Sequence, residues 1–429
     1  MTAPLPPDRR AACRSGDEPP KLRLAYLVSH PIQYQAPLLR RIAREPDIDL
    51  TVFFGSDLSV RGYKDQGFGV EVAWDIPLLE GYRSEWLKSW RDTGSISPGS
   101  PISRGIYRRL RQRDGRPAFD ALWVHGYAGA NSLQAILAAN ALDIPVLLRA
   151  ESWLEDRVRS RWKLGLKRAF FHLLRPGIAA VLPIGTANQA YWTHYFGESF
   201  PQFRMPYAVD NQYFARLAQS SPTRQAELRS ELGIPPGRPV ILFASKLQAR
   251  KHADHLLEAY RLLLGNPSSP STSPPFEHPF LVIVGDGAER PRLEEMTRHL
   301  GLRDVRFAGF RNQSEMPAFF ALASVFVLPS RHEPWGLIVN EAMAAGCPPI
   351  VSSDVGCHYD LISDGVEGWV FPVGDVAALS AALRRCFASP QAAHLMGRNA
   401  QQRIRSWSYE EDVRGLRQAL ACVTGWFRD

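Results

Sequence analysis

The feature that most constrains the fold of this 429-residue chain is a repeated alternation of short apolar runs and segments with helical spacing of apolar residues. In the first half, the runs that we expect to form strands lie at 22–29, 50–54, 121–125, 146–149 and 179–183. In the second half, they lie at 240–244, 280–284, 305–308, 325–328 and 349–352. Such alternation is typical of parallel sheets that helices cover on both faces. The sequence therefore predicts an α/β protein with two Rossmann-like, doubly wound domains that face each other across a cleft.

The two series of runs also predict the domain boundaries. Residues 1–20 are rich in proline and charge and lack the apolar run of a signal peptide, so we expect a disordered leader. We place the N-terminal domain at 21–205 and the C-terminal domain at 206–405. Ligands of such sheets bind beyond the carboxyl ends of the strands, so the residues that follow each strand are the candidates for a site.

Cysteine spacing and hydropathy argue against several classes of protein. The 5 cysteines form no CxxC pair, which disfavours a disulfide framework and a zinc site and favours a reducing compartment. No uninterrupted apolar run reaches the about 18–20 residues that a membrane-spanning helix needs. We therefore expect a cytoplasmic protein, which can still lie on the inner face of the cytoplasmic membrane.

The positive charge of the chain is confined to its first half. Residues 1–205 contain 28 basic and 20 acidic residues, whereas residues 206–429 contain 23 of each, so the first half carries the whole net charge of +8. This asymmetry indicates that one half meets an anionic partner while the other half has a different task.

The most informative stretch is 327–350, with the sequence VLPSRHEPWGLIVNEAMAAGCPPI. A strand ends there, a loop carries Glu333, and a helix that begins near Gly336 carries Glu341. The N-terminus of a helix with glycine at its mouth favours a phosphate or a developing anion. Glu341 can face the same cleft and accept hydrogen bonds from a diol such as a ribose. Taken alone, a helix glutamate of this kind is more often solvated or salt-bridged.

With these residues in place, the sequence resembles the retaining glycosyltransferases of family 4, which have the GT-B fold and use nucleotide-diphosphate sugars. Glu333 and Glu341 match both ends of the E-x7-E motif of that family. The segment 244–252 resembles its phosphate loop, with Lys246 where arginine is common and His252 where glycine is common.

Three further segments match family 4 in the expected order. They are LVIVGDG at 281–287, FAGF at 307–310 and the glycine-containing stretch from Gly365 to Asp375. The turn Gly285-Asp286-Gly287 also resembles the start of a dinucleotide-binding fingerprint. Arg290 stands where that fingerprint needs its third glycine, which disfavours a nicotinamide enzyme.

The resemblance implies a set of donor-site residues. Breaking a sugar–diphosphate bond develops negative charge on the leaving phosphates, which fixed cations can stabilise without a metal. The residues implied in catalysis are Glu333, Lys246 and Lys251. The residues implied in donor binding are Glu341, Gly285, Asp286, Gly287, Phe310, Arg311, Trp335, Gly336 and Leu337. We expect no metal and no cofactor beyond the nucleotide sugar, which is a co-substrate.

The first half offers fewer signals. His30 and Gln33 follow the first strand, where family members commonly have a glycine-rich loop that this chain lacks. They are candidates for contacts with donor or acceptor, and a structural His30 is an equal alternative. His125 ends the strand at 121–125, and Arg149 and Glu151 follow the next strand. We expect Arg149 and Glu151 to form an ion pair that lines the acceptor side.

Basic residues gather at 101–116 and at 157–175. In the second cluster, from Arg157 to Arg175, the cations alternate with apolar residues such as Trp162, as in a helix that lies on a membrane surface. Each cation near an anionic leaflet contributes about 1 kcal/mol. A solvated helix face is the alternative reading, and no motif supports binding of nucleic acid.

These observations predict a glycosyltransferase that moves a sugar from a nucleotide-diphosphate sugar to a saccharide or lipid-linked acceptor, with retention of anomeric configuration. An anionic membrane surface is the expected further partner. The resemblance also implies that the segment 406–429 is a helix that crosses back to the first domain. The alternative function is a catalytically silent scaffold on the same fold that binds nucleotide sugar or membrane.

Overall fold

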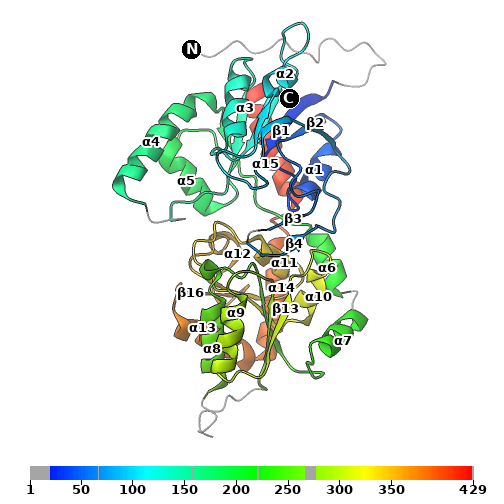
Figure 1. Ribbon diagram of the computed structural model, residues 1–429, viewed down its shortest axis with the longest axis vertical. Helices are drawn as coiled ribbons and strands as arrows, with labels where there is room; N and C mark the ends of the chain where they lie inside the picture. Colours follow the sequence, from blue (N-terminus) through cyan, green and yellow to red (C-terminus); the bar gives the residue numbers. More distant parts are fainter. Residues whose placement is uncertain (1–19, 66, 156–158, 220–221, 266–276, 428–429) are drawn as a thin grey trace. The chain divides into compact units, whose positions relative to one another are not determined.

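The computed structural model describes residues 20–427 except 66, 156–158, 220–221 and 266–276. The predicted leader, apart from its last residue, and Arg157 therefore lie outside the described residues. The chain divides into two compact units (Figure 1). Unit 1 comprises the chain up to Tyr63, Pro77–Pro206 and the chain from Tyr409 on, and unit 2 comprises Lys64–Ile76 and Tyr207–Ser408.

Unit 1 is built on a parallel six-stranded sheet with the strand order β10-β9-β8-β1-β2-β5. Its elements, in chain order, are β1 (Leu22–Val28), α1 (Ala36–Ala43), β2 (Ile48–Phe54), β5 (Arg83–Trp86), β6 (Lys88–Arg91), β7 (Ile102–Arg104), α2 (Ile106–Leu110), β8 (Ala121–His125), α3 (Ala130–Asn140), β9 (Val146–Arg149), α4 (Arg161–Leu174), η2 (Arg175–Gly177), β10 (Ala180–Val181), α5 (Thr186–Phe196) and α15 (Tyr409–Thr424).

Successive side chains of a strand point to opposite faces of a sheet, and helices bury both faces of this one. Leu24 and Tyr26 of β1 pack into a core with α1 and α15, whereas Ala25 and Leu27 pack into a second core with α2, α3, α4 and α5. Unit 1 is therefore doubly wound, with helices on both sides of a buried parallel sheet.

Unit 2 repeats this plan with the strand order β13-β12-β11-β14-β15-β16. Its elements are β4 (Glu71–Val72), α6 (Asn211–Gln219), α7 (Pro222–Glu231), β11 (Val240–Ala244), η3 (Ala249–Lys251), α8 (Ala253–Leu264), β12 (Phe280–Val284), α9 (Arg290–His299), β13 (Val305–Gly309), α10 (Met316–Leu322), β14 (Val325–Leu328), α11 (Leu337–Ala344), β15 (Pro349–Ser352), α12 (His358–Leu361), β16 (Trp369–Phe371), α13 (Val376–Ala388) and α14 (Pro390–Ile404). β3 (Tyr63–Lys64) pairs with β4 and lies at the border of the units.

The two parallel sheets confirm the predicted α/β class. Several strands, such as β8, β11 and β14, have the predicted bounds, because they are continuous apolar runs that the sheet buries completely or almost completely. No elements were predicted for 57–118, where the described residues form five short strands and α2. One of them, β5, is the edge strand of the unit 1 sheet.

The last helix, α15, belongs to unit 1 although it follows unit 2 in the chain. Leu416 and Leu420 are buried in the core formed with β1 and β2. Arg417 forms ion pairs with Glu45 and Asp47, which lie in the loop between α1 and β2. This helix therefore forms part of the core of unit 1.

Each sheet reverses its direction of winding next to its first strand. In unit 2 the chain leaves β11 toward β12 and β13 and then returns to the other side of β11 at β14. In unit 1 the chain leaves β1 toward β2 and β5 and returns at β8. Such switch points leave a crevice beyond the carboxyl ends of the two strands, where ligands of doubly wound sheets bind.

Candidate active site

The candidate site of unit 2 lies at the switch point between β11 and β14. The loop after β11 carries Lys246 and ends in η3 with Lys251, and the loop after β14 carries Glu333. The neighbouring strands β12 and β13 end at the turn Gly285–Gly287 and at Phe310. The sheet order thus brings the residues from four separate motifs to one edge of one sheet.

An ion-pair cluster connects the two loops at the switch point. Glu333 pairs with Lys251, which is 9% exposed, and with Arg250 at 3.1 Å. Burial raises the pKa of Glu333, but the two cations outweigh burial and hold that pKa below its ordinary value. Glu333 is therefore an ionised carboxylate in a net positive environment. Arg250 was not predicted as a site residue, because it lies next to Lys251 in the sequence but matches no motif.

Lys246 has a partner that the sequence did not indicate. Its Nζ donates hydrogen bonds of 2.8 Å to both carboxylate oxygens of Asp65, a residue 181 positions away. Asp65 belongs to the segment Lys64–Ile76 of unit 2. Its side chain is 8% exposed, whereas that of Lys246 is 37% exposed, so the lysine is the more accessible member of the pair.

The glycines of the turn after β12 allow a close approach to the phosphate-loop segment. Gly285 and Gly287 have φ angles of 127° and 151°, and a Cβ atom on either would meet the backbone oxygens of Ser245 or Leu247. The side chain of Asp286 accepts a hydrogen bond of 2.7 Å from Arg290. The turn therefore contributes backbone shape to the site, and Asp286 fixes the start of α9.

At the end of β13, Phe310 and Arg311 have different surroundings. Phe310 is partly exposed and its ring contacts Phe68 and Trp74 of the segment Lys64–Ile76. Arg311 is tied by ion pairs to Glu231 at 2.6 Å and Glu315 at 3.1 Å. Phe310 thus remains a candidate for contact with a nucleobase, and Arg311 has a role in joining α7 to α10.

The N-terminus of α11 is held by its own packing. Gly336 precedes the helix with φ 92° and ψ 59°, a left-handed conformation that favours glycine, and Leu337 is the first helical residue. Trp335 is 3% exposed, donates a hydrogen bond of 2.9 Å to Asn340 and packs on Trp407. Trp335 therefore supports the loop by its packing, and a ligand contact at the backbone of Gly336 stays a prediction.

Glu341 lies on α11 and is 2% exposed. Its carboxyl group has no hydrogen-bond partner among the described residues, and burial alone raises its pKa to about 8. A buried carboxyl group without a partner is costly for a fold, so such groups concentrate at functional sites. Glu341 can accept or donate hydrogen bonds there, because near neutral pH it keeps its proton much of the time.

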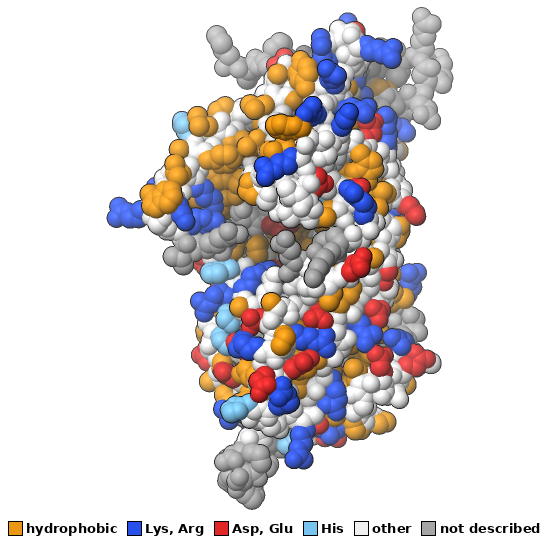
Figure 2. Space-filling view, in the orientation of Figure 1, with side chains coloured by type: hydrophobic (Ala, Val, Ile, Leu, Met, Phe, Trp, Pro, Cys, Tyr) orange, Lys and Arg blue, Asp and Glu red, His pale blue; other side chains and the backbone are white. Residues whose placement is uncertain are grey.

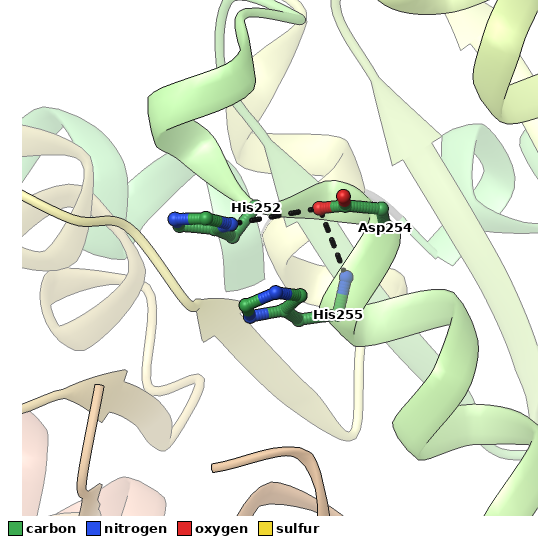
Figure 3. Close-up of side chains that lie close together, drawn as sticks. All are labelled: His252, Asp254 and His255. Atoms are coloured by element: carbon green, nitrogen blue, oxygen red, sulfur yellow. Dashed lines mark hydrogen bonds and ion pairs between the residues drawn. The ribbon is translucent and has the colours of Figure 1, made fainter. Parts of the chain in front are cut away.

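His252 and His255 stand beside the phosphate loop at the start of α8 (Figure 3). His252 has φ 48°, a left-handed conformation that favours glycine. The two rings stack with centroids 4.2 Å apart. Oδ1 of Asp254 lies 3.6 Å from Nδ1 of His252 and accepts a hydrogen bond of 3.1 Å from the backbone N–H of His255. The three side chains are spaced like metal ligands, but Arg292 already pairs with Asp254 at 2.9 Å. We assign this cluster to fixing the start of α8, and the absence of a metal from the reaction stays a prediction.

The switch point of unit 1 carries a network around two histidines. Gln35, which is 5% exposed, accepts a hydrogen bond from Tyr26 and lies 3.0 Å from Nδ1 of His125. The pKa of His30 is lowered to about 4. Burial is the larger cause, and the charge of the nearby His125 is the smaller one. Glu151 lies 3.8 Å from His125. The structure thus groups His30, His125 and Glu151, whose role on the acceptor side stays a prediction, and adds Gln35, which has no local signal.

Two predicted residues of unit 1 differ from this group. Gln33 is half-buried in the turn before α1 and is not joined to the network by any hydrogen bond that the described residues make. Arg149 is 1% exposed and forms an ion pair of 3.1 Å with Asp412 of α15, with further hydrogen bonds to backbone oxygens of Met205 and Pro206. An acceptor-lining role does not suit this burial, so we assign Arg149 to anchoring α15.

Two separate doubly wound units, one with cations and carboxylates at its switch point, define the GT-B class of fold. Solved structures agree. HepE of Anabaena, crystallised with UDP, has a TM-score of 0.69 at 19% identity and covers 94% of this chain and 99% of its own. A glycosyltransferase of Rickettsia africae has a TM-score of 0.70 at 14% identity and covers 94% of this chain and 98% of its own.

Sequence comparisons identify the family. The family model of Glycosyl transferases group 1 matches residues 224–403. The D-inositol 3-phosphate glycosyltransferase of Streptomyces bingchenggensis is 31% identical over 421 residues, which cover 87% of this chain and 89% of that protein. The chain therefore belongs to the glycosyl transferases group 1, or family 4, whose members are retaining glycosyltransferases.

Other relatives match over a shorter stretch. The alpha-D-kanosaminyltransferase of Streptomyces kanamyceticus is 31% identical over 198 residues, which cover 46% of this chain and 48% of that protein. The matches to two further relatives cover 35% and 49% of those proteins. The chain therefore spans about half, or less, of the length of these three curated relatives. These shorter matches identify no acceptor.

Proposed function

We propose that this protein transfers a sugar from a nucleotide-diphosphate sugar to a saccharide or lipid-linked acceptor, with retention of anomeric configuration. The observation that carries the proposal is the cluster at the switch point of unit 2, where Lys251 and Arg250 surround Glu333 and Lys246 stands in the same loop. A site of fixed cations beside one carboxylate suits a substrate that has both a diphosphate and a sugar.

The chemistry follows from where charge develops. When the bond between the sugar and the diphosphate breaks, the oxygen of the leaving phosphate gains negative charge, and fixed cations stabilise it more than they stabilise the intact donor. Lys246, Lys251 and Arg250 supply such cations. Glu333, ionised in their midst, accepts hydrogen bonds from hydroxyls of the donor sugar and offsets the positive charge that develops on its ring.

The remaining donor contacts follow the order of the strands. Phe310, at the end of β13, packs on the nucleobase, and the backbone of Gly285–Gly287 passes beside the nucleotide. Glu341, whose carboxyl has no partner among the described residues, binds the ribose hydroxyls. UDP and UDP-glucose are bound in solved structures of HepE, so the uridine series is the first choice of donor to test.

We assign the acceptor to unit 1. His30, with its lowered pKa, is a neutral imidazole at neutral pH and can accept a hydrogen bond from an acceptor hydroxyl. His125 and Glu151 stand beside it. This surface of hydrogen-bonding groups suits the hydroxyl groups of a saccharide.

Helix α4 supports a membrane surface as the place where the acceptor is met. Trp162, Leu166 and Leu173 are 64%, 62% and 81% exposed, and Arg161, Lys163 and Arg168 on the same helix are exposed as well. Hydrophobic side chains gather over this part of unit 1, with lysine and arginine at its outer end (Figure 2). Exposed apolar residues flanked by cations suit an anionic leaflet. None of the helices in the described part of the chain has the length and apolar character to cross a bilayer.

The test is a screen of UDP-, GDP- and ADP-sugars for release of the nucleotide, with and without vesicles that contain anionic lipid. We expect release from one nucleotide series, and we expect Glu333→Ala to abolish it while the variant still binds the nucleotide. Binding of a nucleotide sugar without any release by the wild-type protein, in the presence of lipid and saccharide acceptors, would instead establish the silent scaffold.

A further inference from the structure

The segment Lys64–Ile76 is an excursion of the chain: its flanks belong to unit 1, and the segment itself belongs to unit 2. Hydrogen bonds fix it there. Asn312 donates from Nδ2 to the backbone oxygen of Ala73 at 2.7 Å, and Asp75 accepts a hydrogen bond from the hydroxyl of Ser314. We call the segment Lys64–Ile76 the strap.

The strap meets the phosphate loop without space between them. A Cβ atom at Gly67 would lie 2.6 Å from Cδ of Lys246 and 2.9 Å from Nε2 of Gln248. From the other side, a Cβ atom at Gly287 would lie 2.8 Å from the backbone oxygen of Gly67. The strap therefore lies directly on the two loops that are assigned to the donor.

Two side chains of the strap, three residues apart, cover two donor-binding positions. Asp65 accepts both of its 2.8 Å hydrogen bonds from Nζ of Lys246, which we assign to the diphosphate. Phe68 packs edge-on against Phe310, which we assign to the base, with ring centroids 4.8 Å apart. Nζ of Lys246 also lies 4.8 Å from the centroid of the Phe68 ring. An anion thus lies on the phosphate lysine, and an aromatic ring lies on the base-binding ring.

The carboxylate of Asp65 is prepared for this contact. It also accepts backbone hydrogen bonds from Gly67 at 2.8 Å and Phe68 at 2.9 Å, which form a tight turn. Burial raises the pKa of Asp65, but the hydrogen bond from Lys246 and these backbone donors hold it below the ordinary value. Asp65 is therefore ionised at neutral pH, as a competitor of a phosphate has to be.

We propose that the strap is an intramolecular substitute for the nucleotide diphosphate, with Asp65 in the place of a phosphate and Phe68 in the place of the base, and that the donor displaces it on binding. The inference rests on the proposed function, because Lys246 and Phe310 matter only if they bind the donor. Its consequence is a donor site that is inhibited until the nucleotide competes successfully with a segment of the same chain. The partly exposed ion pair and the cation–ring contact are each weak, so the inhibition amounts to about three- to tenfold in affinity.

The opposite arrangement is a strap that helps to bind the donor, with Asp65 holding Lys246 in position. The two arrangements predict opposite changes in the affinity for a nucleoside diphosphate when Asp65 loses its charge. In the inhibitory one, loss of the Asp65 charge tightens the binding of a nucleotide diphosphate. In the supporting one, the same change weakens it.

The experiment measures the dissociation constants of UDP, GDP, ADP and uridine by calorimetry for the full-length wild-type protein, Asp65→Asn, Phe68→Ala and Glu71→Gln. Glu71 is exposed on the same strap, so its variant removes an equal charge away from Lys246. We expect Asp65→Asn to bind its preferred nucleoside diphosphate about three- to tenfold more tightly than the wild-type protein, with no such gain for uridine and none for Glu71→Gln. We expect Phe68→Ala to tighten binding of both the diphosphate and the nucleoside.

Hydrogen exchange of the backbone amides at 67–76 gives a second measurement. We expect exchange in the wild-type strap to become faster when the preferred diphosphate is added. Weaker binding by Asp65→Asn, or slower exchange of the strap with nucleotide, would overturn the inference and leave the proposed function intact. A complete lack of nucleotide binding by all four proteins would overturn both, and equal affinities of Asp65→Asn and Glu71→Gln would overturn the inference alone.

Discussion

The two units share one architecture, yet their switch points hold opposite kinds of chemistry. In unit 2, the crevice between β11 and β14 holds ion pairs that join Lys251 and Arg250 to Glu333. In unit 1, the crevice between β1 and β8 holds a hydrogen-bonded network of Tyr26, Gln35 and His125, with His30 beside it. The sheets are alike because both bury their strands between helices, so the difference arises in the short loops that follow the strands.

This difference also separates two uses of positive charge. Unit 2 draws on the electrically balanced half of the sequence, but it concentrates a few cations where a diphosphate can meet them. Part of the basic excess of the first half lies on α4, where Arg161, Lys163 and Arg168 are exposed. The net charge of a unit therefore indicates the character of its surface. The chemistry of its site depends on where two or three charged side chains lie.

The largest effect is expected from Glu333→Gln. The amide keeps the shape of the side chain but removes the charge that faces the donor sugar, so we expect the rate of nucleotide release to fall about a thousandfold. Thermal unfolding of the variant shows whether the unpaired Lys251 weakens the fold. A release rate within a few fold of the wild-type rate, in a folded variant, would exclude a catalytic role for Glu333.

Lys251→Ala tests whether unit 2 alone binds the diphosphate. Loss of a buried cation that contacts a phosphate is expected to weaken the binding of the nucleoside diphosphate about 30- to 100-fold. Lys163→Ala on α4 of unit 1 is the matched control, and we expect the affinity of this variant to equal that of the wild-type protein. The measurement is calorimetry with the nucleotide, and comparable losses in both variants would remove the contrast between the units.

Glu341 gives the stability of the protein a pH dependence. Its carboxyl group keeps a proton up to about pH 8 in the native protein, whereas the ordinary value is 4.5. Between these pH values the native state binds more protons than the unfolded state, so the stability falls as the pH rises through this window. In Glu341→Gln this loss is absent, and we expect its free energy of unfolding to gain about 3 kcal/mol on the wild-type value between pH 5 and pH 8.

Urea unfolding at the two pH values measures this gain. Glu258→Gln is the control, because Glu258 is an exposed acid on α8. A constant difference between Glu341→Gln and the wild-type protein at both pH values would mean that Glu341 is ionised in the fold.

The smallest effect concerns the surface of unit 1. We expect replacement of both Lys163 and Arg168 by alanine to weaken binding to vesicles with anionic lipid about tenfold, since each cation near the leaflet contributes roughly 1 kcal/mol. The control replaces Arg261 and Arg298 of unit 2, which are exposed as well. Vesicle flotation at low and moderate salt measures both. Equal flotation of the two double variants would reduce α4 to a solvated helix face.

The parts of the fold that the sequence predicted well are those with a local cause. β8, β11 and β14 are apolar runs between turns, and their bounds follow from burial. The cations and carboxylates of unit 2 follow strands, and the parallel sheet then brings them to one edge. The strap and β5 had no such signal, because their positions depend on contacts with residues far along the chain.

The residues that were missed or misplaced show the same limit. Arg149 was expected beside Glu151, but its ion-pair partner Asp412 lies 263 positions away on α15. Asp65 and Lys246 are separated by 181 positions. Two charges that meet only after the whole chain has folded leave no pattern of spacing, so such pairs need a structure to find them.

We place the donor diphosphate at the switch point between β11 and β14. The most direct measurement is the hydrogen-exchange footprint of the preferred nucleoside diphosphate over the whole chain. We predict slower exchange at the backbone amides of 245–252 and at the start of α11, with no change at α4 or at the loops that carry His30 and His125. Protection confined to unit 1, or nucleotide binding that leaves 245–252 and α11 unprotected, would contradict the account.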